Sequence, residues 1–228
     1  MGKKRSVYSG SEYKGFVVLD EPRIKKGKVT AFYAPILDGV HSLGVAAVEG
    51  KMVRPSAVML SFAFTEAFAD YDITAVVDRI RHTFRKVRKR RKKASTFKVG
   101  YLWVRETKYL TPSDPEFIES LSASEKRVYR SSMQDDCPIP YPHYHMILIL
   151  DSHKGGWLAV KLVMQRLVNE GIVRAGFHFS ENNNSKKKEL DLRLEPEFSD
   201  YIYRGSYLAK TDTKDLSQKR LWSMSQIK

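Results

Sequence analysis

The stretch from residue 142 to residue 150, Pro-His-Tyr-His-Met-Ile-Leu-Ile-Leu, constrains the fold of this chain more than any other. Five consecutive apolar residues follow the second histidine. An apolar run of this length is typical of a strand that is covered on both faces, whereas a strand with one face in water alternates apolar and polar residues. The sequence therefore predicts a sheet in which this strand lies centrally.

The two histidines at the head of this strand are the first candidate functional residues. His143 and His145 are two positions apart, so in a strand their side chains share a face, roughly 6–7 Å apart. Two imidazoles at this spacing can bind one divalent cation. A single histidine in a strand is more often a packed core residue, and we interpret His178 in this structural way.

Strands and helices are mixed along the rest of the chain, which predicts an α+β fold with a central antiparallel sheet and helices packed against it. Asp72 is a candidate N-cap of one helix, Gly171 is the expected end of another, and Ser199 or Asp200 is the expected cap of a third. The predicted strands are 57–64, 97–106, 175–179 and 189–194, and the predicted helices are 72–93, about 114–130, 157–170 and 199–210.

Length and composition favour one main domain that binds nucleic acid. We expect that domain at residues 57–215, after an N-terminal basic arm or small subdomain at 1–56 and before a polar, basic tail at 216–228. Lys and Arg number 40 against 26 Asp and Glu, a net charge of +14, which is typical of nucleic-acid binders. The chain has no apolar run of about 18 residues and no signal-peptide pattern, so we expect no membrane partner and a cytoplasmic location in a bacterial cell. The single cysteine excludes an internal disulfide and a multi-cysteine zinc site.

Positive charge is most concentrated at residues 85–93, where eight of nine residues are Lys or Arg. A basic run at a helix end can simply be solvated and stabilised by the helix dipole. Its density favours contact with DNA phosphates. The candidate DNA-binding residues are Arg85, Arg88, Arg90, Arg91 and Lys92.

A carboxylate and two tyrosines complete the set of candidate site residues. Glu106 ends the predicted strand 97–106, where a carboxylate could join the histidines as a third metal ligand, although it could also be an ordinary surface residue. Tyr203 and Tyr207 would lie one turn apart on one helix face, with Lys210 near the same face. The alternative interpretation of the tyrosine pair is a half-buried aromatic stripe.

These residue types match one reaction, the cutting of a DNA strand with retention of the energy of the broken bond. A tyrosine hydroxyl attacks the phosphodiester and holds the 5′ side as a phosphotyrosine. Because tyrosine has a pKa near 10 and is a weak nucleophile at neutral pH, the phosphate must be polarised by a metal, and a lysine can stabilise the added charge. A second tyrosine permits a second transfer.

Three stretches, taken in order, carry a resemblance to a known superfamily: residues 101–106, 141–148 and 203–210. With them the chain resembles the HUH endonuclease superfamily, in which two histidines flank a bulky residue. Within it, the chain is most similar to phage-type rolling-circle replication initiators, including the filamentous-phage gene II type and the YagK/YfjJ-like group. The likeness covers roughly residues 57–215. One departure is Ser206, where such initiators often carry a lysine before the second tyrosine.

The resemblance implies a ferredoxin- or palm-like nuclease domain that nicks and rejoins DNA to initiate rolling-circle replication. It implies that His143, His145 and Glu106 bind Mg²⁺ or Mn²⁺, that Tyr207 attacks, and that Tyr203 acts in the second transfer. Lys210 would assist at the phosphate. The implied partner is single-stranded or origin DNA. The chain has no phosphate-cradling ATPase motif, so we expect no internal helicase activity, and recruitment of a host helicase is left open.

Two other functions remain open from the sequence. A transposase or repeat-processing nuclease with a single tyrosine shares the order of histidines before tyrosine. A non-catalytic DNA-binding regulator would share the basic surface but would have no use for the complete set of histidines, tyrosines and lysine. The sequence makes no prediction of the oligomeric state.

Overall fold

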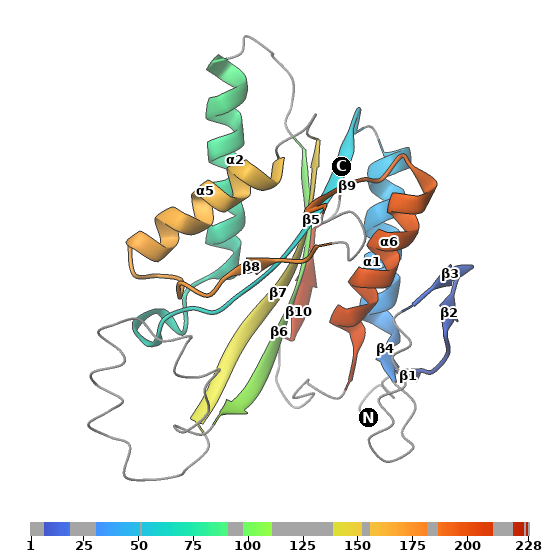
Figure 1. The fold of residues 1–228 in the computed structure, drawn as a ribbon, viewed down its shortest axis with the longest axis horizontal. Coiled ribbons are helices and arrows are strands. Elements are labelled where there is room, and N and C mark those ends of the chain that lie inside the picture. The colour runs from blue at the N-terminus through green and yellow to red at the C-terminus, as the bar shows by residue number, and fades with distance from the viewer. Residues whose placement is uncertain are drawn as a thin grey trace.

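A six-stranded antiparallel sheet organises the protein in a computed structural model (Figure 1). The strand order is β10-β6-β7-β5-β8, and β9 also pairs with β5. The structure describes residues 7–18, 31–50, 52–90, 98–110, 139–151, 156–181, 187–211, 221–225 and 227. In chain order the elements are β1 (Val7–Tyr8), β2 (Glu12–Tyr13), β3 (Phe16–Val17), β4 (Phe32–Tyr33), α1 (Ala34–Glu49), β5 (Pro55–Phe62), η1 (Glu66–Phe68), α2 (Ile73–Arg90), β6 (Val99–Leu110), β7 (Ile139–Asp151), α5 (Gly156–Asn169), β8 (His178–Phe179), β9 (Glu189–Asp191), α6 (Glu195–Ser206), η2 (Tyr207–Ala209) and β10 (Trp222–Met224).

The strand that carries the histidines, β7, lies in the middle of this sheet between β6 and β5, as predicted. Every residue of its apolar run from Met146 to Leu150 is fully buried. Met146, Leu148 and Leu150 belong to the core on one face of the sheet, whereas Ile147 and Ile149 belong to the core on the other. The unbroken apolar run is therefore explained by a sheet that is covered on both faces.

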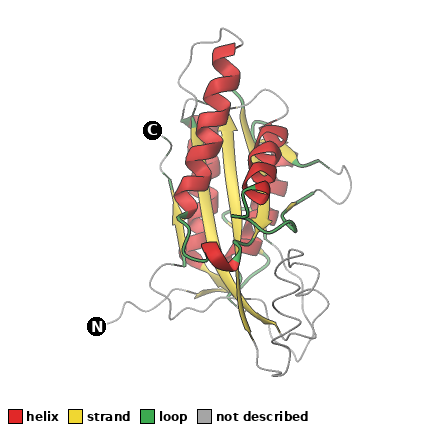
Figure 2. Ribbon diagram, turned by 90° about the vertical axis from the view of Figure 1, so that its left-hand side faces the viewer, coloured by secondary structure: helices red, strands yellow, loops and turns green. Residues whose placement is uncertain are grey.

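In the described part of the chain, α2 and α5 cover one face of the sheet and α1 and α6 cover the other, which confirms the predicted α+β fold class (Figures 1 and 2). The core between the sheet and helices α2 and α5 includes Val76, Ile80 and Val160. The core on the opposite face includes residues of α1 and α6. In the part of the chain that is described, no helix has both the length and the apolar character needed to cross a membrane.

Helix α1 lies within residues 1–56, the range expected to form a basic arm or small subdomain, for which no individual elements were predicted from the sequence. Its buried residues include Ile36, Val40, Leu43 and Ala47, which recur at steps of three and four, so the helical signal was present. Two glycines allow the helix to lie close to its neighbours. A Cβ on Gly44 would lie 2.7 Å from the ring of Tyr201 in α6, and one on Gly39 would lie 2.9 Å from a methyl of Leu102 in β6.

The ends of the helices agree with the predicted signals in two cases and differ in a third. Asp72 caps α2, since its carboxylate accepts a hydrogen bond from the backbone N–H of Thr74 at 2.9 Å. Gly171 follows α5 with a φ of +72°, a backbone conformation that favours glycine. The predicted start of the third helix was wrong: α6 begins at Glu195, with a proline in its first turn, so Ser199 and Asp200 lie inside it.

The range after the predicted nuclease region, expected to be a polar tail, contains a strand of the sheet. In the range predicted as a polar tail, Trp222 pairs with Val104 and Met224 pairs with Leu102, so β10 forms an outer strand of the sheet beside β6. The predicted helix at about 114–130 lies outside the described residues.

Candidate metal centre

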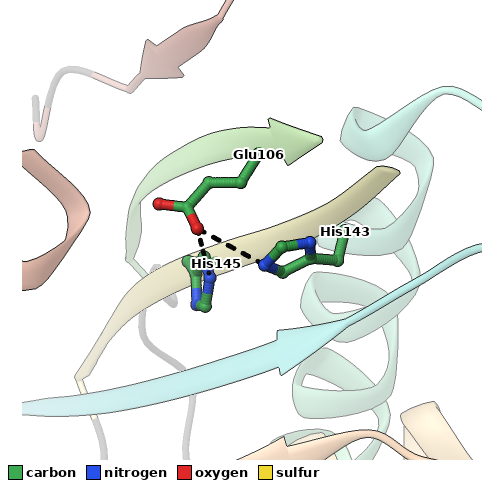
Figure 3. A group of neighbouring side chains, drawn as sticks. All are labelled: Glu106, His143 and His145. Atoms are coloured by element: carbon green, nitrogen blue, oxygen red, sulfur yellow. Dashed lines mark hydrogen bonds and ion pairs between the residues drawn. The ribbon is translucent and has the colours of Figure 1, made fainter. Parts of the chain in front are cut away.

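Pairing between β6 and β7 brings Glu106 to the two histidines. Glu106 is the cross-strand partner of His143, and Val104 is the partner of His145. Cross-strand partners share a face of the sheet. That face is the one covered by α1 and α6, because Val104 and Ile147 belong to the core there. The side chains of Glu106, His143 and His145 therefore converge, as Figure 3 shows.

The distances within this group are short enough for a shared ion. The Nε2 atom of His143 lies 3.4 Å from the Oε2 atom of Glu106, and the Nε2 atom of His145 lies 3.2 Å from the same oxygen (Figure 3). The two imidazole rings meet edge to face with their centroids 4.9 Å apart. One candidate ligand atom from each residue lies within 4.8 Å of the others.

The chemistry of the group fits a divalent cation. Glu106 is 1% exposed and both histidines are 9% exposed, and a buried carboxylate is costly unless a positive charge or hydrogen-bond donors face it. A cation bound by two imidazoles and one carboxylate supplies that charge. Mn²⁺ accepts both nitrogen and oxygen ligands, whereas Mg²⁺ prefers oxygen and keeps most of its water. The residues predicted as metal ligands thus form a buried group that could hold a metal ion.

Tyr207 lies against this group. Its ring centroid is 5.2 Å from that of His145, at an interplanar angle of 72°. Two residues earlier, α6 packs tightly against α1. A Cβ on Gly205 would lie 2.5 Å from Val40 of α1, and it would lie at an ordinary contact distance of 3.4 Å from Ile147 of β7. The short turn η2 then begins at Tyr207.

Lys210 is almost completely buried beside Tyr207. It is 3% exposed, and its Nζ atom lies 4.9 Å from the centroid of the Tyr207 ring. An ammonium group over an aromatic ring is a favourable arrangement, more so when water is excluded. The backbone of Lys210 bridges to Phe32 of β4, so the residue is held where η2 meets the N-terminal part of the chain.

Tyr203 is placed differently from Tyr207. It is 38% exposed, and among the described residues no hydrogen bond, ion pair or ring contact joins it to the three residues of the metal group. The predicted single helix through both tyrosines is divided, because α6 ends at Ser206 and Tyr207 begins η2. The Ser206 hydroxyl donates to the backbone carbonyl of Tyr203 at 2.6 Å.

Tyr201, in the same helix as Tyr203, is a packing residue. It is fully buried, and its hydroxyl donates a hydrogen bond to the backbone carbonyl of Val40 at 2.7 Å. Burial raises the pKa of this phenol far above its usual range.

The part of the basic run that the structure describes, at the C-terminal end of α2, lies away from the metal group. Helix α2 covers the face of the sheet opposite to α1 and α6, and its C-terminal end lies at the top of Figure 1. The metal group lies near the end of β6 and the start of β7, which are toward the bottom of the figure. Arg85 is exposed. The side chains of Arg88 and Arg90, and all of Arg91 and Lys92, lie outside the described residues. Contact between this run and DNA stays a prediction.

The sequence analysis missed one residue at the metal group. Ser61 of β5 is the cross-strand partner of His145, and its Oγ atom lies 2.6 Å from the Nδ1 atom of that histidine. The signal in the sequence was a hydroxyl residue within a strand that is otherwise strongly apolar. On the other side of Ser61, its partner His178 is exposed and does not belong to the group of candidate metal ligands found among the described residues.

Comparison with known proteins adds no relative. The chain matches no protein-family model, no curated protein and no solved structure. The functional argument therefore depends on the residues of the site.

Proposed function

We propose that this protein is a metal-dependent, strand-specific DNA nickase and ligase that initiates rolling-circle replication of a phage, plasmid or integrated element. One observation carries the proposal. A tyrosine lies in ring contact with a histidine of a buried His-His-Glu group, and a buried lysine lies over the same tyrosine. Tyrosine, metal ligands and lysine are the groups that a transfer of DNA to tyrosine requires.

In the proposed reaction, the Oη atom of Tyr207 attacks a backbone phosphorus of single-stranded DNA. The new Oη–P bond forms as the bond from phosphorus to the 3′ oxygen breaks, and the proton lost by the phenol balances the proton gained by the leaving oxygen. The products are a free 3′ hydroxyl and a 5′-phosphotyrosine. Attack by the 3′ hydroxyl on this linkage reverses the step and rejoins a strand.

Each remaining residue has a role that its position supports. His143, His145 and Glu106 would hold Mn²⁺ or Mg²⁺, which when bound polarises the non-bridging oxygens of the phosphate. Lys210 lies on the tyrosine side of the group and adds positive charge for the transition state. The overall charge of +14 favours binding of the DNA backbone. A host helicase would unwind the duplex.

The test uses single-stranded oligonucleotides of random internal sequence, labelled at the 3′ end, with Mn²⁺. Because the 5′-phosphate side stays on the protein, the label should appear in a covalent adduct on a denaturing gel, and peptide mapping should place it on Tyr207. Tyr207→Phe keeps the ring but lacks the attacking oxygen, so the adduct should be lost. An adduct that persists in Tyr207→Phe, or the lack of any adduct with the wild-type protein, would contradict the proposal.

A single-tyrosine transposase or repeat-processing nuclease is the second candidate, favoured by the position of Tyr203. This residue is exposed and has no described contact with the metal group, and the lysine expected before Tyr207 is replaced by Ser206. Tyr203→Phe distinguishes the two functions. In an initiator with two tyrosines this variant nicks once and fails to release a closed circle, whereas in a single-tyrosine enzyme it completes both steps.

A further inference from the structure

The hydrogen bond between Ser61 and His145 has a consequence for metal binding. A neutral imidazole carries its proton on one of two nitrogens, and only the nitrogen without the proton can bind a metal. In His145, Nε2 faces Glu106 at 3.2 Å and Nδ1 faces the Ser61 hydroxyl at 2.6 Å. The proton must be on Nδ1 if Nε2 is to be a ligand.

Without a metal, the two nitrogens compete for this proton. With the proton on Nε2, His145 would donate to the Glu106 carboxylate, which closes the site, and the Ser61 hydroxyl would donate to Nδ1. With the proton on Nδ1, His145 would donate to the Ser61 oxygen, and Nε2 would be left open to a metal. We infer that Ser61 is a positioning residue that fixes the ring orientation of His145 and accepts its Nδ1 proton when Nε2 binds a metal, an inference that rests on the metal centre of the proposed function.

The sheet holds Ser61 rigidly for this role. It lies one residue from the end of a continuous β5–β7 pairing that runs from Pro55 to Phe62. Its neighbours Leu60 and Phe62 are buried in the core on the opposite face, so the strand cannot rotate to withdraw the hydroxyl. Partners that orient metal-binding histidines in this way typically change metal affinity 10–100-fold when they are removed.

The test compares two variants of equal shape. Ser61→Val and Ser61→Thr add nearly the same volume in a strand that tolerates β-branched residues, but only threonine keeps the hydroxyl. Affinity for Mn²⁺ is measured by calorimetry in the absence of DNA. Ser61→Val should bind about 10–100-fold more weakly than wild type, and Ser61→Thr should restore the affinity.

Ser56 provides the matched control. It lies in the same strand and is buried, and its hydroxyl donates to a carboxylate oxygen of Glu189 at 2.7 Å, far along β5 from His145. Ser56→Val therefore removes a comparable hydrogen bond and should lower stability without changing Mn²⁺ affinity. If Ser56→Val and Ser61→Val weaken binding equally, the effect is one of stability and the inference fails.

A second readout reports the tautomer itself. The protein is labelled with ¹⁵N-histidine and loaded with Zn²⁺, which is diamagnetic and is also bound by imidazole and carboxylate ligands. The Nδ1 proton of His145 should exchange slowly with water in the wild type and in Ser61→Thr. In Ser61→Val it should exchange rapidly. Equal Mn²⁺ affinity in all three proteins, or a proton on Nε2, overturns the inference. The proposed function fails separately, if metal binds as described but no tyrosine–DNA adduct forms.

Discussion

Replacement of Gly205 by alanine tests how tightly the tyrosine-bearing helix α6 is packed against α1. Two effects oppose each other. Alanine in a helix is favoured over glycine by about 0.5–1 kcal/mol. The added Cβ, however, would lie 2.5 Å from a methyl carbon of Val40, about 1 Å closer than ordinary contact. Val40 is buried and β-branched in α1, so it has a single favoured rotamer and cannot turn away.

The steric effect should dominate, because overpacking a buried contact costs about 1–3 kcal/mol. We expect Gly205→Ala to lower the free energy of unfolding by about 1–2 kcal/mol, with a fall in melting temperature of about 2–4 °C for each kcal/mol. Urea unfolding followed by circular dichroism measures the change. Since α6 must move outward, Tyr207 should also lose its contact with His145, and adduct formation should fall.

Two further variants separate the contact from general effects. Val40→Ala removes the methyl groups that a Cβ on Gly205 would meet. The double variant Val40→Ala, Gly205→Ala should therefore lose at least about 1 kcal/mol less stability than the sum of the losses of the two single variants. Gly176→Ala is the control, because a Cβ there has no heavy atom within 4 Å and should change stability by less than about 0.5 kcal/mol. If Gly205→Ala is about 0.5–1 kcal/mol more stable than wild type, the full helix propensity gain is realised without a steric cost, and the close packing of α6 against α1 is refuted.

Two other predictions concern the metal and the pH dependence of stability. Mn²⁺ at 100 times its dissociation constant should stabilise the wild type by about 2.7 kcal/mol and raise its melting temperature by about 5–10 °C, as measured by differential scanning fluorimetry. His143→Ala should abolish this shift in melting temperature. An undiminished shift in the variant would show that the ion binds elsewhere. Burial raises the pKa of the Tyr201 phenol in the folded protein. Above about pH 10 the phenol therefore ionises in the unfolded chain while it stays protonated in the folded one, and the free energy of unfolding falls by up to about 1.4 kcal/mol per pH unit. Below about pH 10 the contribution of Tyr201 to stability is complete. Urea unfolding between pH 9 and 11 measures how steeply the free energy of unfolding falls with pH. This fall should be smaller in Tyr201→Phe than in the wild type by up to about 1.4 kcal/mol per pH unit, and an equal fall in both proteins would argue against burial of the phenol.

The elements that the sequence determined are those with a local signal. The apolar run from Met146 to Leu150 indicated a buried central strand, since continuous apolar character requires cover on both faces. The spacing of His143 and His145 placed both on one face, because side chains alternate along any strand. Asp72 and Gly171 marked helix ends through hydrogen bonding and backbone conformation, which are properties of single residues and their neighbours.

The tertiary structure decided which residues meet. Glu106 lies opposite His143 only in the observed register, and a shift by one residue would turn it to the other face of the sheet. No local pattern could assign Ser61 to His145, since 84 residues separate them. Tyr207 reaches the metal group while Tyr203 stays exposed because Gly205 lets α6 approach α1, and the helix then ends. Short-range sequence patterns determine the elements and their faces, whereas strand register and helix packing depend on contacts between distant parts of the chain, and the site is built from those contacts.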